Sequence, residues 1–449
     1  FTERRAGTAA RGELPRAQRK AGKGAAGAGL FAEQAAHNQL EHEEHNGQDH
    51  GGEKAGQQAC PPGPGGDAVE HFTLGLQGGH GLIKLVDALH LLLVQALVQR
   101  GEQGFRALVV LVEQAALLGD QALVDYIKKF EDISISQEQI RISREEIEEA
   151  YHKVDSETIE AIRTLAGNVK RFHAAQMPNK MWSTEVSPGL VAGQIIIPLE
   201  KVGCYVPGGR GWFPSAVMMS VLPAKVAGVP NVYVCTPSAP DGAIPPGTLI
   251  ACDICGADAV FRVGGSQAVA AMAHGTQTIP KVDKIVGPGS KWVLAAFKLL
   301  HGVVEIGTLA GPGEGIILAD ETANPEYAAA DICIQSEHGL DSAGVLVTHV
   351  PALAYAVQEK IGRHIERLND YRKNFVVESL KKYGAIILTD SFEESIAYVN
   401  EYAGEHLEIM TAEPLHDMQK IKNAGGIYLG PYTPLSTGCF GSGPNHVLP

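Results

Sequence analysis

Length, composition and charge exclude several classes of protein. The chain has 449 residues, of which 45% are hydrophobic and 20% are charged, and its formal net charge is -14. This size is sufficient for roughly two or three soluble domains. The acidic balance argues against nucleic-acid binding. The apolar run at residues 88–97 contains His90 and Gln95 and is too short to cross a bilayer.

Cysteine usage predicts a reducing compartment. The seven cysteines are an odd and scattered set, and no signal peptide precedes the part of the sequence that has a globular composition. We therefore expect a cytoplasmic protein with no membrane partner. Cys252 and Cys255 form a lone C-x-x-C pair in a predicted helix, and we interpret them as buried core thiols in preference to a redox or zinc site.

Residues 1–118 differ from the rest of the chain. They contain no Ser, Tyr, Trp or Met and a single Ile, Ile83. Two interpretations are open, namely a wrongly translated or mis-joined segment and a genuine low-complexity extension. In either case the apolar residues from Leu82 to Leu118 are expected to form helices.

From residue 119 onward, helical and strand patterns alternate. Residues 120–130 have a helical pattern, Ser143 and Glu146 form a capping box, and a longer helix starts near Ser156. Such alternation is typical of parallel sheets covered by helices, so we expect an α/β fold. The expected strands are residues 232–236, 259–263, 284–286, 315–319, 344–348, 385–388, 407–410 and 426–429.

The stretch from Ala310 to Gly339 is the centre of the predicted site. A buried strand at residues 316–319 is followed by Pro325, whose fixed φ suits the first turn of a helix. That helix is expected to carry Gln335 and His338 three residues apart on one face. Two such side chains can share a metal ion, and a capped surface helix end gives the same pattern.

Other polar residues and glycine-rich turns lie at predicted strand ends. Glu405 and His406 are adjacent just before strand 407–410, and His446 lies near the end of the sequence. Ligands of open α/β sheets collect at the carboxyl ends of strands, where glycine lets the backbone approach a ligand. From residue 119 on there is no G-x-G-x-x-G fingerprint, so the turns alone favour a nucleotide site and plain tight turns equally. The turns are residues 207–210, 263–267, 287–290 and 311–313.

Taken together, these motifs resemble those of the histidinol dehydrogenase family, which performs the last step of histidine synthesis. Their order and spacing cover almost all of the sequence from about residue 119 to 449, and the match does not extend to residues 1–118. The motifs are YVPGG at 205–209, PAKVAG at 223–228, RVGGSQA at 262–268, VDKIVGPG at 282–289, AGP at 310–312, QSEH at 335–338, GEHL at 404–407 and NHVLP at 445–449.

The resemblance implies a fold and an activity. It implies a homodimer with two incomplete Rossmann-like domains. Residues 119–204 plus 313–449 would carry the metal and catalytic residues, and residues 205–312 would bind NAD. The activity would be NAD-dependent oxidation of L-histidinol through histidinal to L-histidine, with one zinc ion in each site. Zinc polarises an alcohol oxygen so that a neutral histidine can remove its proton.

The resemblance also implies roles for individual residues. Tyr205, Gln267 and Ser290 match NAD contacts, with Ser290 standing where the family has Asn. Glu405 and His406 match the general bases, and His406 also faces the substrate.

Other positions match the metal and substrate sites. Gln335 and His338 match zinc ligands that also face the substrate, and His446 lines the substrate pocket. Cys439 stands where the family has a zinc-ligating Asp, and a thiolate is also a good zinc ligand. Gly313 replaces a substrate-facing Ser.

The departures from the family pattern keep two alternatives open. Gly313, together with Gly339 in place of an expected Asp, favours a paralogue that oxidises another small polar alcohol. Cys439 favours a truncated or degenerate chain that folds without chemistry. The missing tail favours the same alternative. In the family a further segment follows the NHVLP motif, crosses to the other subunit and brings a final His ligand, whereas the sequence here stops at Pro449.

Overall fold

The computed structural model describes residues 111–208 and 211–448, without the side chains of Cys439 and Phe440. The expectations for residues 1–110 lie outside the described residues. Residues 111–118 are helical, as expected, and Leu111, Val112 and Ala115 are buried in the same hydrophobic cluster as helix α3 (Asp120–Glu131). The last part of the compositionally unusual segment therefore belongs to the core.

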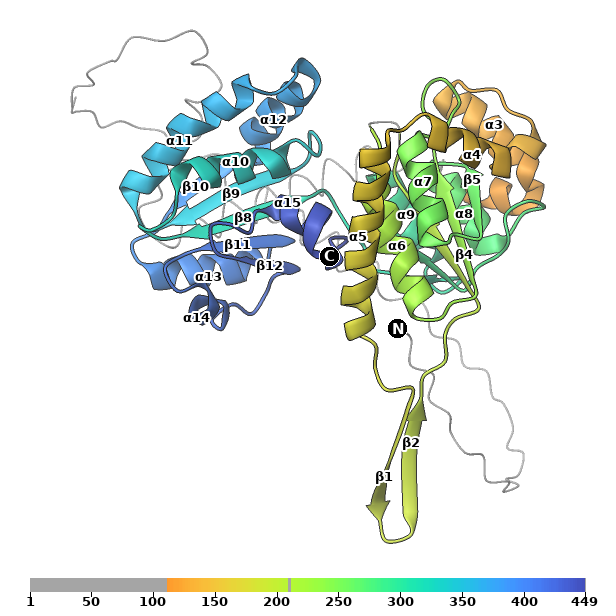
Figure 1. Cartoon of the computed structure of the whole chain (residues 1–449), viewed down its shortest axis with the longest axis horizontal. Coiled ribbons are helices and arrows are strands. Elements are labelled where there is room, and N and C mark those ends of the chain that lie inside the picture. Colours follow the sequence, from red (N-terminus) through yellow and green to blue (C-terminus); the bar gives the residue numbers. More distant parts are fainter. Residues whose placement is uncertain (1–110, 209–210, 449) are drawn as a thin grey trace, which may run out of the picture. The chain divides into compact units, whose positions relative to one another are not determined.

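The first sheet contains five strands in the order β5-β4-β3-β6-β7, and all neighbouring pairs are parallel. Its two faces are covered by separate hydrophobic clusters. In Figure 1, helices labelled α3 to α9 surround these strands. The strands are β3 (Lys201–Tyr205), β4 (Asn231–Thr236), β5 (Ala259–Arg262), β6 (Lys284–Val286) and β7 (Glu305–Ile306), and the helices are α3, α4 (Arg144–His152), α5 (Ser156–Ala175), α6 (Pro214–Val226), α7 (Pro246–Cys255), α8 (Gly265–His274) and α9 (Lys291–Leu300), with a short turn of helix η2 (Gln137–Gln139).

Helices α3, α4 and α5 pack on the first sheet. Their buried side chains share hydrophobic clusters with the strands of that sheet, and β3 begins at Lys201. The resemblance groups residues 119–204 with residues 313–449. An amphipathic helix can cover either of two sheets, so its sequence alone does not decide between them. The division of the chain into two functional domains stays a prediction.

The predicted capping box also joins α4 to the first sheet. Ser143 Oγ accepts from the Glu146 N–H at 3.2 Å, and Glu146 Oε2 accepts from the Ser143 N–H at 3.0 Å. The other carboxylate oxygen of Glu146 pairs with the buried guanidinium of Arg262 on β5. One carboxylate therefore both caps the helix and neutralises a buried charge.

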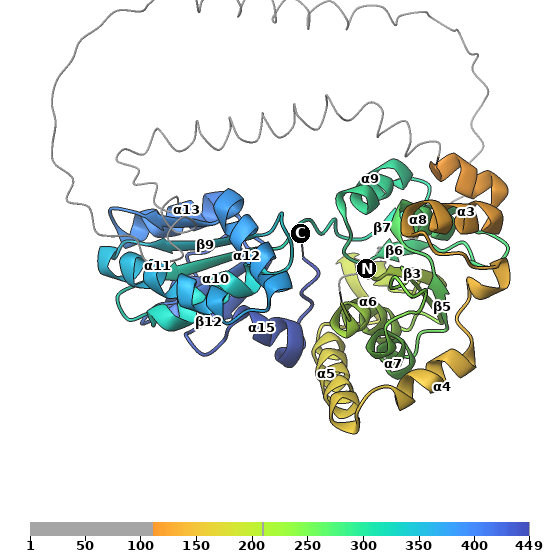
Figure 2. The same cartoon turned by 90° about the horizontal axis from the view of Figure 1, so that it is seen from above.

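The second sheet has the order β10-β9-β8-β11-β12 and is also parallel throughout. Helices α10, α11 and α12 pack on one face, and α13 packs on the other (Figures 1 and 2). The predicted strands agree with the observed ones to within one residue. The strands are β8 (Glu314–Ala319), β9 (Ala343–Thr348), β10 (Ala385–Leu388), β11 (His406–Met410) and β12 (Gly426–Leu429), and the helices are α10 (Pro325–Ser336), α11 (Pro351–Glu366), α12 (Asp370–Tyr383), α13 (Phe392–Tyr402), α14 (Pro414–Met418), α15 (Leu435–Thr437) and η3 (Gly438–Ser442).

A two-stranded hairpin, β1 (Met181–Ser187) and β2 (Leu190–Ile195), had no counterpart among the predicted elements. Gly189 turns the chain at φ 78°, and its N–H donates to Glu185 Oε1 at 2.7 Å. All residues of β1 are exposed, so the strand lacks the buried face that produces an alternating pattern in a sequence.

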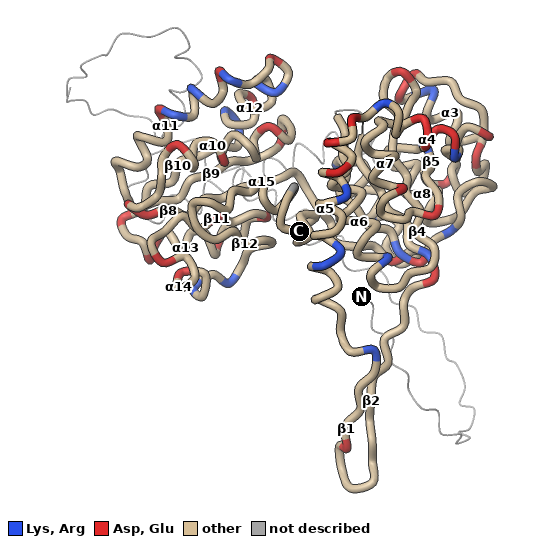
Figure 3. Tube along the Cα trace, viewed as in Figure 1, with Lys and Arg blue, Asp and Glu red and all other residues tan. Residues whose placement is uncertain are grey.

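The described residues can be compared with the expectations about surface charge, membrane-spanning helices and buried thiols. Figure 3 shows Lys and Arg interspersed with Asp and Glu over the helices of both sheets, in keeping with the acidic net charge. None of the described helices is both long and apolar enough to cross a membrane. Cys252 and Cys255 are buried free thiols on α7, as expected, and burial raises the pKa of Cys255 to about 12.

Candidate functional site

The amino ends of β8 and β11 hold the two predicted bases. Glu405 immediately precedes β11, His406 is its first residue, and their side chains are only 12% and 6% exposed. His406 Nδ1 lies 3.3 Å from Glu405 Oε2 and 3.2 Å from the Glu314 carbonyl oxygen. Both neighbours accept hydrogen bonds, so Nδ1 carries the proton in the neutral ring. The other nitrogen, Nε2, is then the basic one.

The basic nitrogen of His406, Nε2, is buried and has no hydrogen-bond partner. Buried polar atoms are nearly always paired, so an unpaired one at a candidate site indicates a place for a ligand atom. The ring is also held by Tyr428, whose centroid lies 5.9 Å from that of His406.

Gln335 and His338 lie at the end of α10, but not both on the helix as predicted. The α-helix ends at Ser336, and His338 follows one residue after the C-cap, with its N–H donating to the Gln335 carbonyl oxygen at 3.3 Å. His338 Nδ1 is 3.0 Å from the Ile334 carbonyl oxygen, so it donates and leaves Nε2 as a free acceptor.

The Gln335 amide occupies the space beside Gly313. A Cβ atom at Gly313 would lie 2.3 Å from Gln335 Nε2 and 3.7 Å from Glu405 Oε2. Gln335 itself is 3% exposed. The missing side chain at Gly313 therefore lets the Gln335 amide lie close to the backbone that leads into β8.

His446 comes to the same place from the end of the described chain. Burial, and then the nearby His406 and His338, lower the pKa of His446 to about 4. Its ring is thus neutral near pH 7, and its Nδ1 is buried without a partner. The preceding Asn445 anchors this segment, because its Nδ2 donates to the Met219 carbonyl oxygen at 2.9 Å.

The donor set fits a metal ion only in part. Gln335 and His338 offer oxygen and nitrogen atoms of the kinds that zinc accepts. Among the described side chains, however, no group of three or more His, Cys, Asp or Glu residues is arranged to hold a metal. The Cys439 side chain lies outside the described ones. The described residues alone therefore do not form a complete zinc site.

The predicted NAD contacts lie together at the carboxyl edge of the first sheet. Tyr205 is the last residue of β3, and its hydroxyl accepts from the Gly265 N–H at 3.2 Å. Gln267 is buried in the first turn of α8, and Ser290 is the N-cap of α9 without a side-chain capping bond. Their contacts with NAD stay predictions.

Glycines at this edge pack closely against neighbouring parts of the chain. Gly287 has φ 122°, and a Cβ atom there would lie 2.0 Å from the Tyr205 carbonyl oxygen. At Gly264 a Cβ atom would lie 2.3 Å from Pro237 Cβ. These turns follow β6 and β5, on the side where open α/β sheets bind dinucleotides, so the edge fits such a cofactor.

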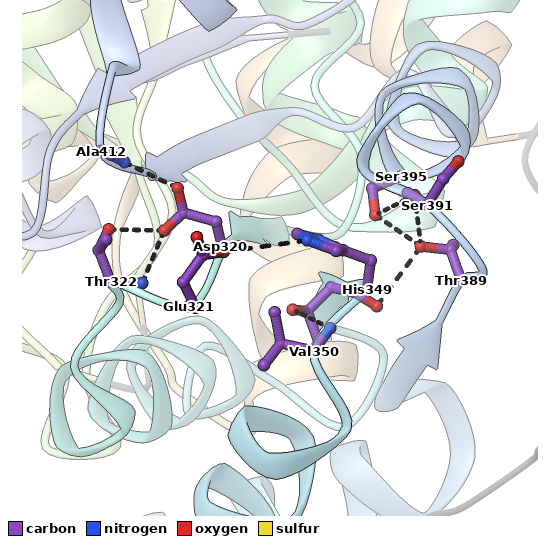
Figure 4. Close-up of polar contacts among 10 residues, drawn as sticks. Asp320, Glu321, Thr322, His349, Val350, Thr389, Ser391, Ser395 and Ala412 are labelled. Atoms are coloured by element: carbon purple, nitrogen blue, oxygen red, sulfur yellow. Dashed lines mark hydrogen bonds and ion pairs between the residues drawn. The ribbon is translucent and has the colours of Figure 1, made fainter.

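At the corresponding edge of the second sheet the Asp320 side chain contacts two loops (Figure 4). Asp320 follows β8, and its Oδ1 accepts from the Thr322 N–H at 2.9 Å. Its Oδ2 accepts from the Ala412 N–H, just beyond β11, at 2.8 Å. Asp320 thus bridges the ends of the two strands between which the strand order reverses.

Sequence reasoning missed Glu314 as a site residue. The residue follows Gly313 directly and begins β8. Its backbone contacts both Glu405 and His406, with the N–H donating to Glu405 Oε2 at 3.1 Å. The only available signal was its position between a candidate turn and a predicted strand.

These features define an α/β protein with a glycine-rich carboxyl edge on one parallel sheet and a histidine–glutamate cluster on another. The model of the family described as histidinol dehydrogenase matches residues 102–449. The chain belongs to the histidinol dehydrogenase family, which is a family of NAD-dependent oxidoreductases. The match begins at residue 102, so it extends further toward the amino end than the motifs predicted.

Individual relatives agree with this family assignment. Histidinol dehydrogenase from Methanothermobacter thermautotrophicus is 48% identical over 331 residues, covering 74% of this chain and 76% of the relative. The Synechocystis enzyme of that name is 44% identical over 357 residues, covering 79% and 82%. The crystal structure of histidinol dehydrogenase from Elizabethkingia anophelis matches with a TM-score of 0.73 and 36% identity, covering 77% of this chain and 78% of that one.

Proposed function

We propose that this protein oxidises L-histidinol through histidinal to L-histidine with NAD as the oxidant. The observation that carries the proposal is the Glu405–His406 pair, in which one imidazole nitrogen is held by acceptors and the other is buried and unpaired. A two-step oxidation needs a base for hydroxyl protons and a base for water, and this pair offers both.

The first step removes a proton and a hydride from the alcohol. His406 Nε2 takes the hydroxyl proton, while Nδ1–H stays bonded to the Glu314 carbonyl oxygen and beside Glu405. NAD, when bound, accepts the hydride from carbon. The neutral His446 lines the pocket without adding a positive charge that would raise the cost of forming an imidazolium at His406.

The second step begins with hydration of the aldehyde. Glu405 Oε2 is held by the Glu314 N–H, so we assign the attacking water to Oε1. The water oxygen bonds to the aldehyde carbon and its proton goes to Glu405, while His406 returns the proton of the first step to the aldehyde oxygen. The neutral His406 then takes one hydroxyl proton of the hydrate as the second hydride leaves to NAD. The carboxylic acid that forms ionises to the carboxylate, and two NAD are reduced per alcohol.

The zinc ion, the homodimer and the cytoplasmic location also remain proposals. Gln335, His338 and Cys439 are the candidate zinc ligands, and no step above is derived through the metal because the described donor set is incomplete. Burial of the five described free cysteines suits a reducing compartment. Metal analysis of the purified protein and light scattering test the first two proposals.

A second candidate activity is oxidation of another small polar alcohol. The placement of the Gln335 amide beside Gly313 favours it, because a substrate-facing hydroxyl is replaced there by an amide. A panel of alcohols with NAD separates the candidates. We expect histidinol to have the highest kcat/KM and to yield two NADH, whereas a single NADH with release of aldehyde would contradict the proposal.

A further inference from the structure

A proline inside helix α6 leaves a backbone acceptor without its usual donor. Pro223 lies within the helix and has no N–H, so the carbonyl of Met219, four residues earlier, cannot make the regular helical hydrogen bond. The Asn445 side chain takes that place, with its Nδ2 donating to the Met219 carbonyl oxygen at 2.9 Å. One side-chain amide therefore joins the end of the described chain to the turn of α6 that Pro223 interrupts.

The oxygen of the same amide shapes the backbone around His446. Asn445 Oδ1 accepts from the Val447 N–H at 2.8 Å, which closes a turn over the residue between them. The Val447 side chain packs against the hydrophobic cluster that contains the buried residues of α6. His446 thus lies between two residues that are both attached to the first sheet and its helices.

The next residue lies against the peptide that carries the two proposed bases. A Cβ atom at Gly425 would lie 2.6 Å from the Glu405 carbonyl oxygen and 3.1 Å from Leu448 Cβ. Gly426 is the partner of His406 in the pairing of β11 with β12, and a Cβ atom there would lie 3.1 Å from Leu448 Cδ1. The segment therefore reaches the amino edge of the second sheet.

His446 faces this same edge. Its Nδ1 is buried without a partner, and its pKa is lowered by burial and then by the nearby His406 and His338. Residues 445 and 447 thus hold the segment on the α6 side, while residues 446 and 448 meet the site. A displacement of the Asn445 amide would move the His446 ring relative to the bases.

We propose that Asn445 is a positioning residue, which uses the acceptor freed by Pro223 to hold His446 in the substrate pocket. The inference rests on the proposed function and adds two residues that act through His446. The net contribution of one hydrogen bond corresponds to about a tenfold change in an equilibrium constant. We therefore expect an effect of that size on the KM for histidinol.

The first test compares Asn445→Ala with Asn445→Ser. Alanine removes both hydrogen bonds, whereas the shorter serine can still accept from the Val447 N–H but should not reach the Met219 carbonyl. Both variants should raise the KM for histidinol by about tenfold and leave the KM for NAD unchanged. If Asn445→Ala does not fold, the serine variant carries the test. The control is Asn179→Ala, at an exposed position before β1, which should behave as wild type.

A double-mutant cycle separates positioning from a general loosening of the fold. His446→Ala removes the ring that Asn445 is proposed to hold, so adding Asn445→Ala to that variant should change the KM for histidinol little further. Independent effects, which multiply in the double variant, would show that Asn445 does not act through His446 and would overturn the proposal.

Pro223→Ala tests the origin of the free acceptor. Alanine supplies an N–H that competes with Asn445 for the Met219 carbonyl, so the KM for histidinol should rise. Tm should stay the same or increase, because alanine is the better helix former. A wild-type KM in Pro223→Ala would overturn the role of the proline.

Amide hydrogen exchange gives a readout that does not depend on activity. The Val447 N–H should exchange faster in Asn445→Ala than in wild type, with Asn445→Ser between them. Wild-type exchange together with a wild-type KM in Asn445→Ala would contradict the proposal. If the wild-type protein oxidises neither histidinol nor histidinal, the proposed function fails, while exchange still decides whether Asn445 holds the segment.

Discussion

The two sheets have the same strand order but offer different edges for chemistry. In each, three strands are added in one direction and the fourth pairs on the other side of the first, which gives β5-β4-β3-β6-β7 and β10-β9-β8-β11-β12. At the reversal in the first sheet, Gly287 approaches the Tyr205 carbonyl oxygen. At the reversal in the second sheet, Asp320 bridges to the Ala412 N–H.

This difference teaches that strand order alone does not make a nucleotide site. In the first sheet glycines follow β5 and β6, and glycine lets the backbone approach a ligand closely. In the second sheet a hydrogen-bonded carboxylate bridges two strands at the same edge, and the unpaired His406 Nε2 lies at the opposite, amino edge. Predictions can therefore be directed at one edge at a time.

The largest expected effect comes from the amino edge of the second sheet. His406→Asn should slow both oxidations, and Glu405→Gln should slow aldehyde conversion far more than alcohol oxidation, each by about 10²–10⁴-fold. Rates with histidinol and histidinal supplied separately, together with NADH counts, measure the two steps. Equal slowing of both steps by Glu405→Gln would rule out its assignment as the water-activating base.

A change at the carboxyl edge of the first sheet should affect NAD binding. Gly287→Ala puts a Cβ atom against the Tyr205 carbonyl oxygen at a φ that disfavours side chains, with strain of about 1–3 kcal/mol. The expected results are a higher KM for NAD and a lower Tm, measured by kinetics and thermal unfolding.

A glycine with open space around it provides the control for that change. Gly302 has φ 96°, but a Cβ atom added there would have no neighbouring atom within 4 Å. Gly302→Ala therefore tests the φ strain without the crowding. If both variants raise the KM for NAD equally, the crowded glycine is not what keeps the edge open.

The metal proposal can be tested through Cys439. Cys439→Asp should keep or raise zinc affinity and Cys439→Ala should lower it, because Asp and Cys are both zinc ligands and Ala is not. Zinc content after dialysis against a chelator is the measurement. Equal zinc content in all three proteins would place this residue outside the metal site.

A smaller effect, on stability, is expected at Glu408, two residues after His406 on β11. Glu408 on β11 is fully buried, and burial followed by the nearby Asp331 carboxyl raises its pKa well above the usual value. The unfolded chain ionises first as the pH rises, so the folded protein loses stability above the unfolded pKa.

Glu408→Gln cannot ionise, so it removes this loss of stability at high pH. It should raise Tm on the order of 2–4 °C at ~pH 8 and less at ~pH 5. Glu413→Gln, at an exposed position after the same strand, is the control and should leave Tm unchanged at both pH values. A Tm gain for Glu408→Gln that is larger at ~pH 5 would contradict the assignment of a raised pKa.

The sequence predicted those parts of the fold whose signal is local. Strands at residues 284–286, 385–388 and 426–429 were predicted with their observed bounds, because short apolar runs between turn residues mark buried strands. The β1–β2 hairpin was not predicted, since its exposed strands have no buried face. Which sheet α3–α5 would cover depends on packing between elements distant in sequence.

The sequence singled out His338, His406 and His446 as candidate site residues. The structure brings His406 and His338 within electrostatic reach of His446, and the roles of the three side chains stay predictions. The end of α10 before His338 was missed because helix boundaries depend on capping contacts. Glu314 was missed because its main contacts with the bases are made by backbone atoms, which every residue type has.

The backbone of residue 314 also has a consequence for protein engineering. A catalyst that stops at the aldehyde would be useful, and shifting one base away from the other is an obvious route to it. Here both bases are anchored to the same residue of β8, so any insertion, deletion or register shift near that residue would displace them together. Uncoupling the two oxidations therefore calls for side-chain exchange at Glu405, with the strand left in place.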